Sequence, residues 1–120
     1  MIYIETKQQQ AIKTLIIEAI EEVTGVPREL WEQARSKNRD EVFIRKMYVW
    51  MLKKYGRYTN DGIARCVSLK NISTVVKCHT DVDAWFDSEE HTMEASIMKQ
   101  IEETYEQLLS KNPITHSGHR

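Results

Sequence analysis

Short polar side chains and cations are concentrated between Lys70 and Lys77, and their spacing suits hydrogen bonding rather than bond breaking. As a helix, this segment places Ser73, Thr74 and Lys77 on one polar face, opposite an apolar stripe formed by Ile72, Val75, Cys78 and Val82. A recognition helix in a DNA groove needs this division, with one side packed on the protein and the other side offering short donors and a cation to base edges and phosphates. Asn71 is suited to adenine, because its amide pairs with N6 and N7.

The elements on either side of Lys70 predict a helix-turn-helix. A short helix is expected over about residues 60–66, with the Thr59 hydroxyl capping its first turn. The chain then breaks near Ser68–Lys70, and a recognition helix follows over about residues 71–84. Ile63 and Val67 are expected in the core. The free N–H groups at the two helix starts, and Lys70 between the helices, suit phosphate groups.

A basic loop and a basic helix come before this motif. Arg35, Lys37 and Arg39 alternate in a polar stretch that we expect to be an exposed loop, able to follow a phosphate backbone or enter a minor groove. A helix is predicted from about Asp40 to Tyr55, ended by Gly56. Its polar side is expected to be basic, through Arg45, Lys46, Lys53, Lys54 and Arg57. Electrostatic docking on DNA is therefore assigned to Arg35, Lys37, Arg39, Arg45, Lys46, Arg57 and Lys70.

Charge is divided unequally along the 120 residues, although the net charge is only −1. The segment from Arg28 to His79 has 12 Lys or Arg against 5 Asp or Glu, a net charge of +7. The segment from Thr80 to Ser110 has one Lys against 9 Asp or Glu, a net charge of −8. Such asymmetry points to a nucleic-acid surface on the basic part, while chance segregation of charge on helices is the alternative.

The remaining chain is predicted to be helical, so the fold class is all-α. Helices are expected over about 8–24, 28–33 and 92–109, with Gly25 as a helix stop and with Leu30 and Trp31 pointing inward. The length and the apolar content of 41% fit a single domain over residues 1–110, followed by a mobile tail over 111–120.

Nothing in the sequence favours catalysis, a metal or a membrane. Nucleophile-elbow, phosphate-loop and HExxH motifs do not occur, so we expect no enzyme, no catalytic residue and no cofactor. Cys66, Cys78, His79 and His91 match no zinc spacing, and core thiols are the favoured interpretation of the cysteines. With no apolar run that could span a membrane and no signal-peptide pattern, a cytoplasmic protein is expected.

Four pieces of the sequence occur in a familiar order and spacing: Arg35-Ser-Lys-Asn-Arg39, Arg45-Lys-Met-Tyr-Val-Trp-Met-Leu52, Thr59-Asn-Asp-Gly-Ile-Ala64 and Lys70-Asn-Ile-Ser-Thr-Val-Val-Lys-Cys78. Together they resemble the C-terminal DNA-binding domain of the bacterial replication initiator DnaA, over residues 8–109. The family's Ser/Thr-Thr-Val core is present as Ser73-Thr74-Val75, whereas its Asp-His pair is replaced by Asn71-Ile72. The resemblance implies a small, Trp-repressor-like helical fold with a helix-turn-helix. It also implies double-stranded DNA as the partner, in replication, transcription regulation or the control of a mobile element.

Two other functions remain open from the residues alone. One is a protein-interaction module that kept the fold and lost DNA binding, with Trp85 and Phe86 as exposed anchors. For these two aromatic residues, packing against the last helix is the alternative. The other is a homodimer that buries the apolar stripe of the last helix. A DNA-binding protein should carry its cations on the same surface as Ser73 and Thr74, with its acidic residues on the far side.

Overall fold

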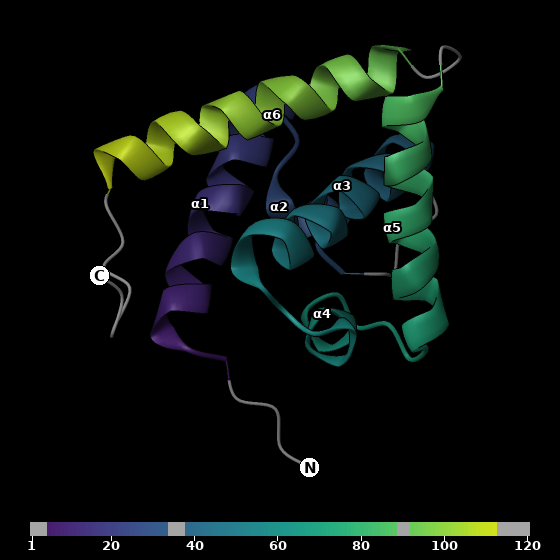
Figure 1. Ribbon diagram of the computed structural model, residues 1–120. Helices are drawn as coiled ribbons and strands as arrows, with labels where there is room; N and C mark the ends of the chain where they lie inside the picture. Colours follow the sequence, from purple (N-terminus) through teal and green to yellow (C-terminus); the bar gives the residue numbers. More distant parts are fainter. Residues whose placement is uncertain (1–4, 34–37, 89–91, 113–120) are drawn as a thin grey trace.

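Six helices make up the described part of the chain, and α3 (Arg39–Gly56) lies at their centre (Figure 1). The computed structural model describes residues 5–33, 38–88 and 92–112. Over these residues the protein is all-helical, without a strand, as predicted. Besides α3, the helices are α1 (Lys7–Thr24), α2 (Arg28–Trp31), α4 (Asn60–Cys66), α5 (Ile72–Asp87) and α6 (Thr92–Lys111).

Local sequence signals set most helix ends. Thr6 and Gln9 form a capping box at the start of α1, and Gly25 ends that helix with a φ of 72°. Asn38 caps α3 by accepting from the N–H groups of Asp40 and Glu41. Thr59 caps α4 as predicted, since its Oγ1 accepts from the N–H of Gly62 at 3.0 Å. These caps join residues within three positions of one another, so the local sequence specifies where each helix begins.

The end of α3 differs from the prediction that Gly56 is its stop. Gly56 is the last helical residue, and Arg57 takes the left-handed conformation with a φ of 56°. The glycine is needed for packing, because a Cβ at this position would lie 2.6 Å from the ring of Tyr58. The ring of Tyr58 is buried at this point. The turn therefore combines a close approach at Gly56 with a strained backbone at Arg57.

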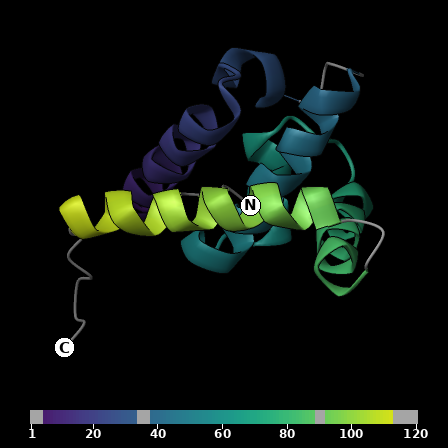
Figure 2. The same cartoon turned by 90° about the horizontal axis from the view of Figure 1, so that it is seen from above.

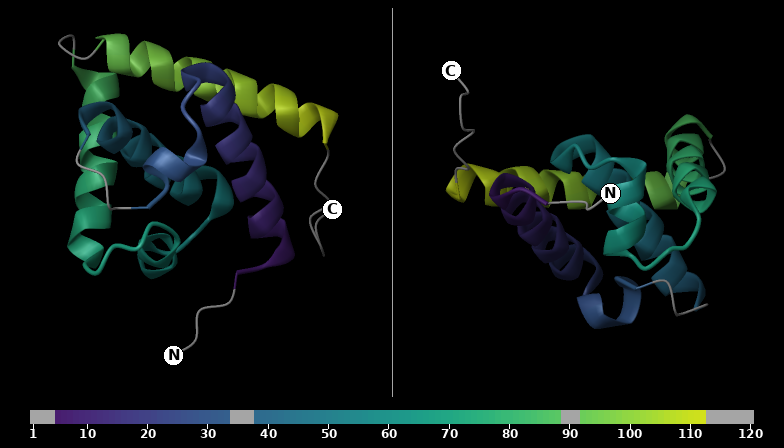
Figure 3. Two further views of the ribbon diagram at one scale, coloured as in Figure 1. Left: turned by 180° about the vertical axis from the view of Figure 1, so that it is seen from behind. Right: turned by 90° about the horizontal axis from the view of Figure 1, so that it is seen from below.

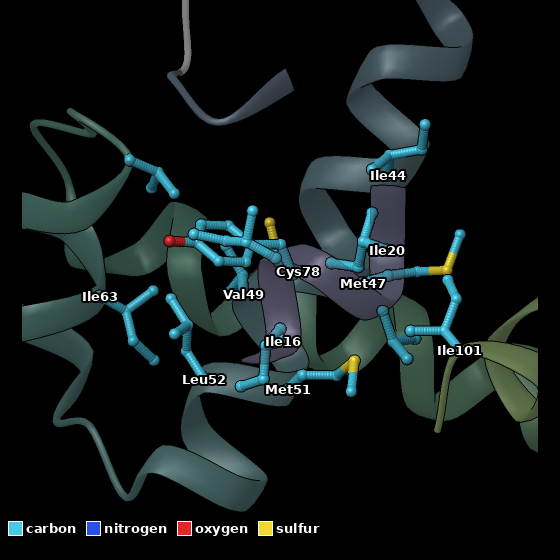
Figure 4. Close-up of a cluster of buried hydrophobic side chains, with 14 of the residues drawn as sticks. Ile16, Ile20, Ile44, Met47, Val49, Met51, Leu52, Ile63, Cys78 and Ile101 are labelled. Atoms are coloured by element: carbon cyan, nitrogen blue, oxygen red, sulfur yellow. The ribbon is translucent and has the colours of Figure 1, made fainter. Parts of the chain in front are cut away.

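The core is built around α3, with side chains from α1, α4, α5 and α6 converging on it (Figure 4). Its centre contains Ile16, Ile20, Met47, Val49, Met51, Leu52, Ile63, Val75, Val82 and Ile101, all of them fully buried. The predicted positions Ile63 and Val67 are therefore confirmed as core. Trp31 is also fully buried, but Leu30 is 49% exposed, so the prediction that both point inward was wrong for Leu30. In a helix of four residues, Trp31 alone reaches Tyr48 of α3, edge-on at 5.0 Å between ring centroids.

In the view of Figure 1, α6 crosses the top of the domain and α2 lies behind α3, as the views from above and from behind also show (Figures 2 and 3). Helix α6 crosses from the end of α5 to α1, and its stripe Met98, Ile101 and Tyr105 is buried. It extends to Lys111, so Lys111 belongs to the helix rather than to the predicted tail; residues 113–120 lie outside the described part. At the foot of α5, α4 packs against the first turns of that helix (Figure 1). This arrangement leaves one flank of α5 exposed.

Candidate nucleic-acid interface

Helix α5 has one buried and one exposed side, and most of the predicted division is confirmed. Val75, Cys78 and Val82 are buried, whereas Ser73, Thr74 and Lys77 are exposed. The helix continues to Asp87 rather than to residue 84. Its buried stripe faces α3 and α4, so the polar side chains of its first two turns point away from the protein.

Ile72 was predicted on the buried stripe, but it is 45% exposed. Three helical residues rotate by about 300°, so Ile72 and Cys78 lie on opposite sides of Val75, about 120° apart. The buried stripe follows the Cys78 side, towards Val82 and Trp85. Ile72 therefore lies on the side of Val75 that points away from the buried stripe.

Asn71 caps α5, and the cap uses the oxygen of its side-chain amide. Oδ1 accepts from the N–H of Ser73 at 3.0 Å and from Ser73 Oγ at 2.8 Å. A bidentate contact with adenine needs the same oxygen as an acceptor from N6. Capping thus competes with the base contact predicted for Asn71, and it also orients the Ser73 hydroxyl towards Asn71.

The connection between α4 and α5 holds the two helices in place. The N–H of Leu69 donates to the carbonyl of Ala64 at 2.8 Å, and Ser68 adopts a φ of 57°. The Ser68 hydroxyl donates to Gln33, whose amide also donates to the carbonyl of Cys66 at 3.2 Å. Residues just before the predicted basic loop are therefore tied to the turn. Lys70 follows this turn and is exposed.

Lys46 and Lys77 share one carboxylate, that of Asp81. Lys46 Nζ lies 2.8 Å from Asp81 Oδ2, and Lys77 Nζ lies 3.3 Å from the same atom. The hydrogen bond from Lys46, and then that from Lys77, hold the pKa of Asp81 below its usual value, against the opposing effect of burial. An acidic residue thus lies on the same flank as two predicted phosphate-binding lysines, contrary to the expected separation of the charges.

Arg45 was predicted on the basic surface, and this was wrong. Its side chain is buried, and its Nε donates to the carbonyl of Trp31 at 3.0 Å. Burial lowers the pKa of this guanidinium, with partial compensation from Cys78 and Glu41. Arg45 lies against α2 and serves as a link between α2 and α3.

Among the other predicted cations, Arg39 and Arg57 are exposed but far apart. Arg39 is the first residue of α3 and Arg57 follows its last residue. With a rise of 1.5 Å per residue, these two lie roughly 27 Å apart. The structure therefore does not bring Arg39 and Arg57 together. Arg35 and Lys37 lie outside the described residues, so the predicted basic loop is represented by Arg39 alone.

Sequence reasoning missed a groove between α3, the start of α4 and the exposed flank of α5. It is lined by Trp50, Lys53, Lys54, Asn60, Val76, His79, Thr80 and Asp83. Trp50 donates from Nε1 to Asp83 at 3.0 Å, and Lys53 donates to Asn60 at 2.9 Å. Burial, and then the charge of Lys53, lowers the pKa of His79, which favours a neutral imidazole. Trp50 and Asp83 on its two sides are 33 positions apart in the sequence, so no local signal could reveal the groove.

The aromatic residues near the end of α5 are not exposed anchors. Trp85 is buried against Phe43, with 4.8 Å between ring centroids, and half-buried Phe86 lies 5.5 Å from Trp50. Both ring partners belong to α3, and Ala95 and Lys99 of the last helix line the same pocket as Trp85 and Phe86. The packing alternative is thus correct, with α3 as a further partner.

Other chemistry finds little support in the described residues. They contain no group of three or more His, Cys, Asp or Glu side chains placed to hold a metal, and His91 lies outside them. Burial raises the pKa of both thiols, Cys66 and Cys78, which disfavours the thiolate form. Within the same residues, no helix combines the length and the apolar character that crossing a bilayer demands.

Comparison of the chain with family models, with curated proteins and with solved structures gives no match. The case for a function therefore rests on the residues and the geometry described above.

Proposed function

We propose that this protein binds double-stranded DNA, with α4 and α5 acting as a helix-turn-helix and α5 as the recognition helix. The observation that carries the proposal is the division of α5 into a packed face and an exposed face. Val75, Cys78 and Val82 anchor one side, while Ser73 and Lys77 on the other side face solvent. A helix held in this way can enter a major groove without losing its contacts with the domain.

The order of the elements also supports this function. A seven-residue helix, a short connection and a longer helix follow one another, and α4 packs against α5. These elements, with α3 and α1 behind them, appear in the order that the resemblance to the DnaA C-terminal domain implies. A Trp-repressor-like fold is therefore part of the proposal.

Phosphate contacts are assigned to a smaller set of cations than the sequence indicated. Lys70 is exposed beside the start of α5, Lys77 is exposed on its polar side, and Arg39 is exposed at the start of α3. Lys46 joins them only when it is released from Asp81. The helix starts at Asn60 and Ile72 add backbone N–H groups, although the Thr59 and Asn71 side chains already occupy some of these donors.

The test is a fluorescence-anisotropy titration with a random-sequence duplex at several salt concentrations. We expect binding that weakens steeply with salt, because phosphate contacts release counterions. Lys77→Ala should reduce the slope of log K against log salt by about 0.9. Lys99→Ala is the matched control, since it removes another exposed lysine, from α6, and should leave the slope unchanged. Absence of binding at low salt would refute the proposal.

A protein-interaction module is the second candidate, and one observation favours it. Asp81 neutralises Lys46 and Lys77, and Asp83 lies in the neighbouring groove, so this flank of α5 is less positive than a dedicated DNA surface. The homodimer alternative predicted an interface formed by the apolar stripe of α6. Met98, Ile101 and Tyr105 of this stripe are already buried within one chain, so they are not available for a partner. If the anisotropy titration shows no binding, the groove beside Val76 becomes the surface to test for a protein partner.

A further inference from the structure

Two large apolar side chains are exposed on the part of α5 that the proposed function places in the major groove. Ile72 is 45% exposed and Val76 is 46% exposed. Within the described residues, only two other large hydrophobic side chains are similarly exposed, Leu30 in α2 and Met93 in α6. Two of the four thus lie on the first turns of a single helix.

Their spacing places Ile72 and Val76 on the same flank. Residues four apart on a helix differ by about 40° in direction and by about 6 Å along the axis. Both are β-branched, so each side chain is held in few rotamers and loses little freedom on contact. Together they form a short, rigid apolar ridge along the helix.

Polar and charged groups surround this ridge, which argues against burial in an apolar protein interface. Val76 lines the groove beside α3 together with Lys53, Lys54 and His79, and the exposed Lys70 lies two residues before Ile72. The nearest carboxylate in the groove, that of Asp83, accepts a hydrogen bond from Trp50. An apolar ridge flanked by cations matches a ligand that carries isolated methyl groups between phosphates.

Thymine in duplex DNA has this chemistry. Its 5-methyl group is the apolar feature that base pairs present in the major groove, and apolar side chains read it by contact. Base pairs are stacked about 3.4 Å apart, so a ridge of about 6 Å spans roughly two base-pair steps. We infer that Ile72 and Val76 recognise thymine methyl groups, and that the preferred duplex has thymines roughly two steps apart beneath α5. This inference rests on the proposed DNA binding.

The experiment replaces thymine with deoxyuridine, which lacks only the methyl group. A preferred duplex is first selected from a random library with the full chain, and each thymine is then replaced singly. We expect two positions at which the replacement weakens binding about fourfold, which corresponds to about 0.8 kcal/mol per methyl group. The readout is anisotropy at constant salt.

Variants assign each methyl group to a side chain. Ile72→Ala should abolish the thymine preference at one position, and Val76→Ala should abolish it at the other. Met93→Ala is the matched control, because it truncates an exposed apolar residue at the start of α6, beyond the opposite end of α5. It should leave both preferences intact. All three residues are exposed, so the variants should retain the wild-type melting temperature.

The outcomes separate this inference from the proposed function. Loss of the thymine preference in the α5 variants alone would support both. Salt-dependent binding that is equal for thymine and deoxyuridine at every position would overturn the inference and leave DNA binding standing. Failure to bind any duplex would overturn the proposed function and this inference with it.

Discussion

Replacing Asp81 with asparagine tests whether the flank of α5 that carries Lys46 and Lys77 faces phosphate. The variant keeps the shape of the side chain and removes the charge that both lysines contact, at 2.8 Å and 3.3 Å. If these lysines lie near DNA, Asp81→Asn releases them to bind phosphate. We therefore expect tighter binding and a slope of log K against log salt that is steeper by about 0.9, because Lys46 adds one phosphate contact to that of Lys77.

The cost of Asp81→Asn to folding should be small. The side chains of Lys46 and Asp81 are 28% and 24% exposed, and Lys77 is 72% exposed. Pairs in such partly solvated positions contribute about 0.2–1 kcal/mol. With two such pairs lost, the melting temperature should fall by at most about 8 °C. A variant that remains folded at the titration temperature makes the binding result interpretable.

The pH dependence of this stability difference has a definite sign. The pKa of Asp81 is lowered in the folded protein, so its contribution is present above the unfolded value of about 3.9. It is lost as pH falls through the folded pKa. The stability gap between wild type and Asp81→Asn should be constant near neutral pH and should close below about pH 4. Thermal melts across this range measure it.

A matched control separates the local effect from net charge. Glu103→Gln also raises the net charge by one, but it changes an exposed residue of α6. Its salt slope should match that of the wild type. Equal steepening in both variants would show a general charge effect, and an unchanged slope in Asp81→Asn would refute the assignment of Lys46 and Lys77 to a phosphate-facing surface.

Three further variants test other parts of the interface. Arg39→Ala should flatten the salt slope by about 0.9, and an unchanged slope would remove Arg39 from the phosphate contacts. Arg45→Ala should instead lower the free energy of unfolding by about 1–3 kcal/mol, because the buried Trp31 carbonyl loses its donor, while the salt slope stays constant. Asn71→Ala should cost about 1 kcal/mol of stability through the lost cap, and relax specificity at one base pair by roughly 1–3 kcal/mol. Asn71→Ser restores a capping hydroxyl, so unaltered specificity in that variant would reduce Asn71 to a cap.

Local sequence signals determined the helices and their starts. Caps at Asn38, Thr59 and Asn71 act within three residues, and Gly25 needs only its own backbone freedom. The apolar periodicity also identified most buried positions, because one stripe of each long helix must face the core. These features depend on neighbours in sequence, and so the sequence alone was sufficient to predict them.

Tertiary packing decided which helix faces remain available for binding. Arg45 is buried, where its Nε donates to the Trp31 carbonyl of α2, whereas Ile72 at the start of α5 remains 45% exposed. The pairing of Lys46 with Asp81 joins residues 35 positions apart. Amphipathic periodicity predicts that a helix has a polar side. It does not predict which distant element covers that side, or which charged side chain pairs with the residues on it. The helices could thus be predicted from the sequence, whereas the composition of the proposed interface depends on how they pack.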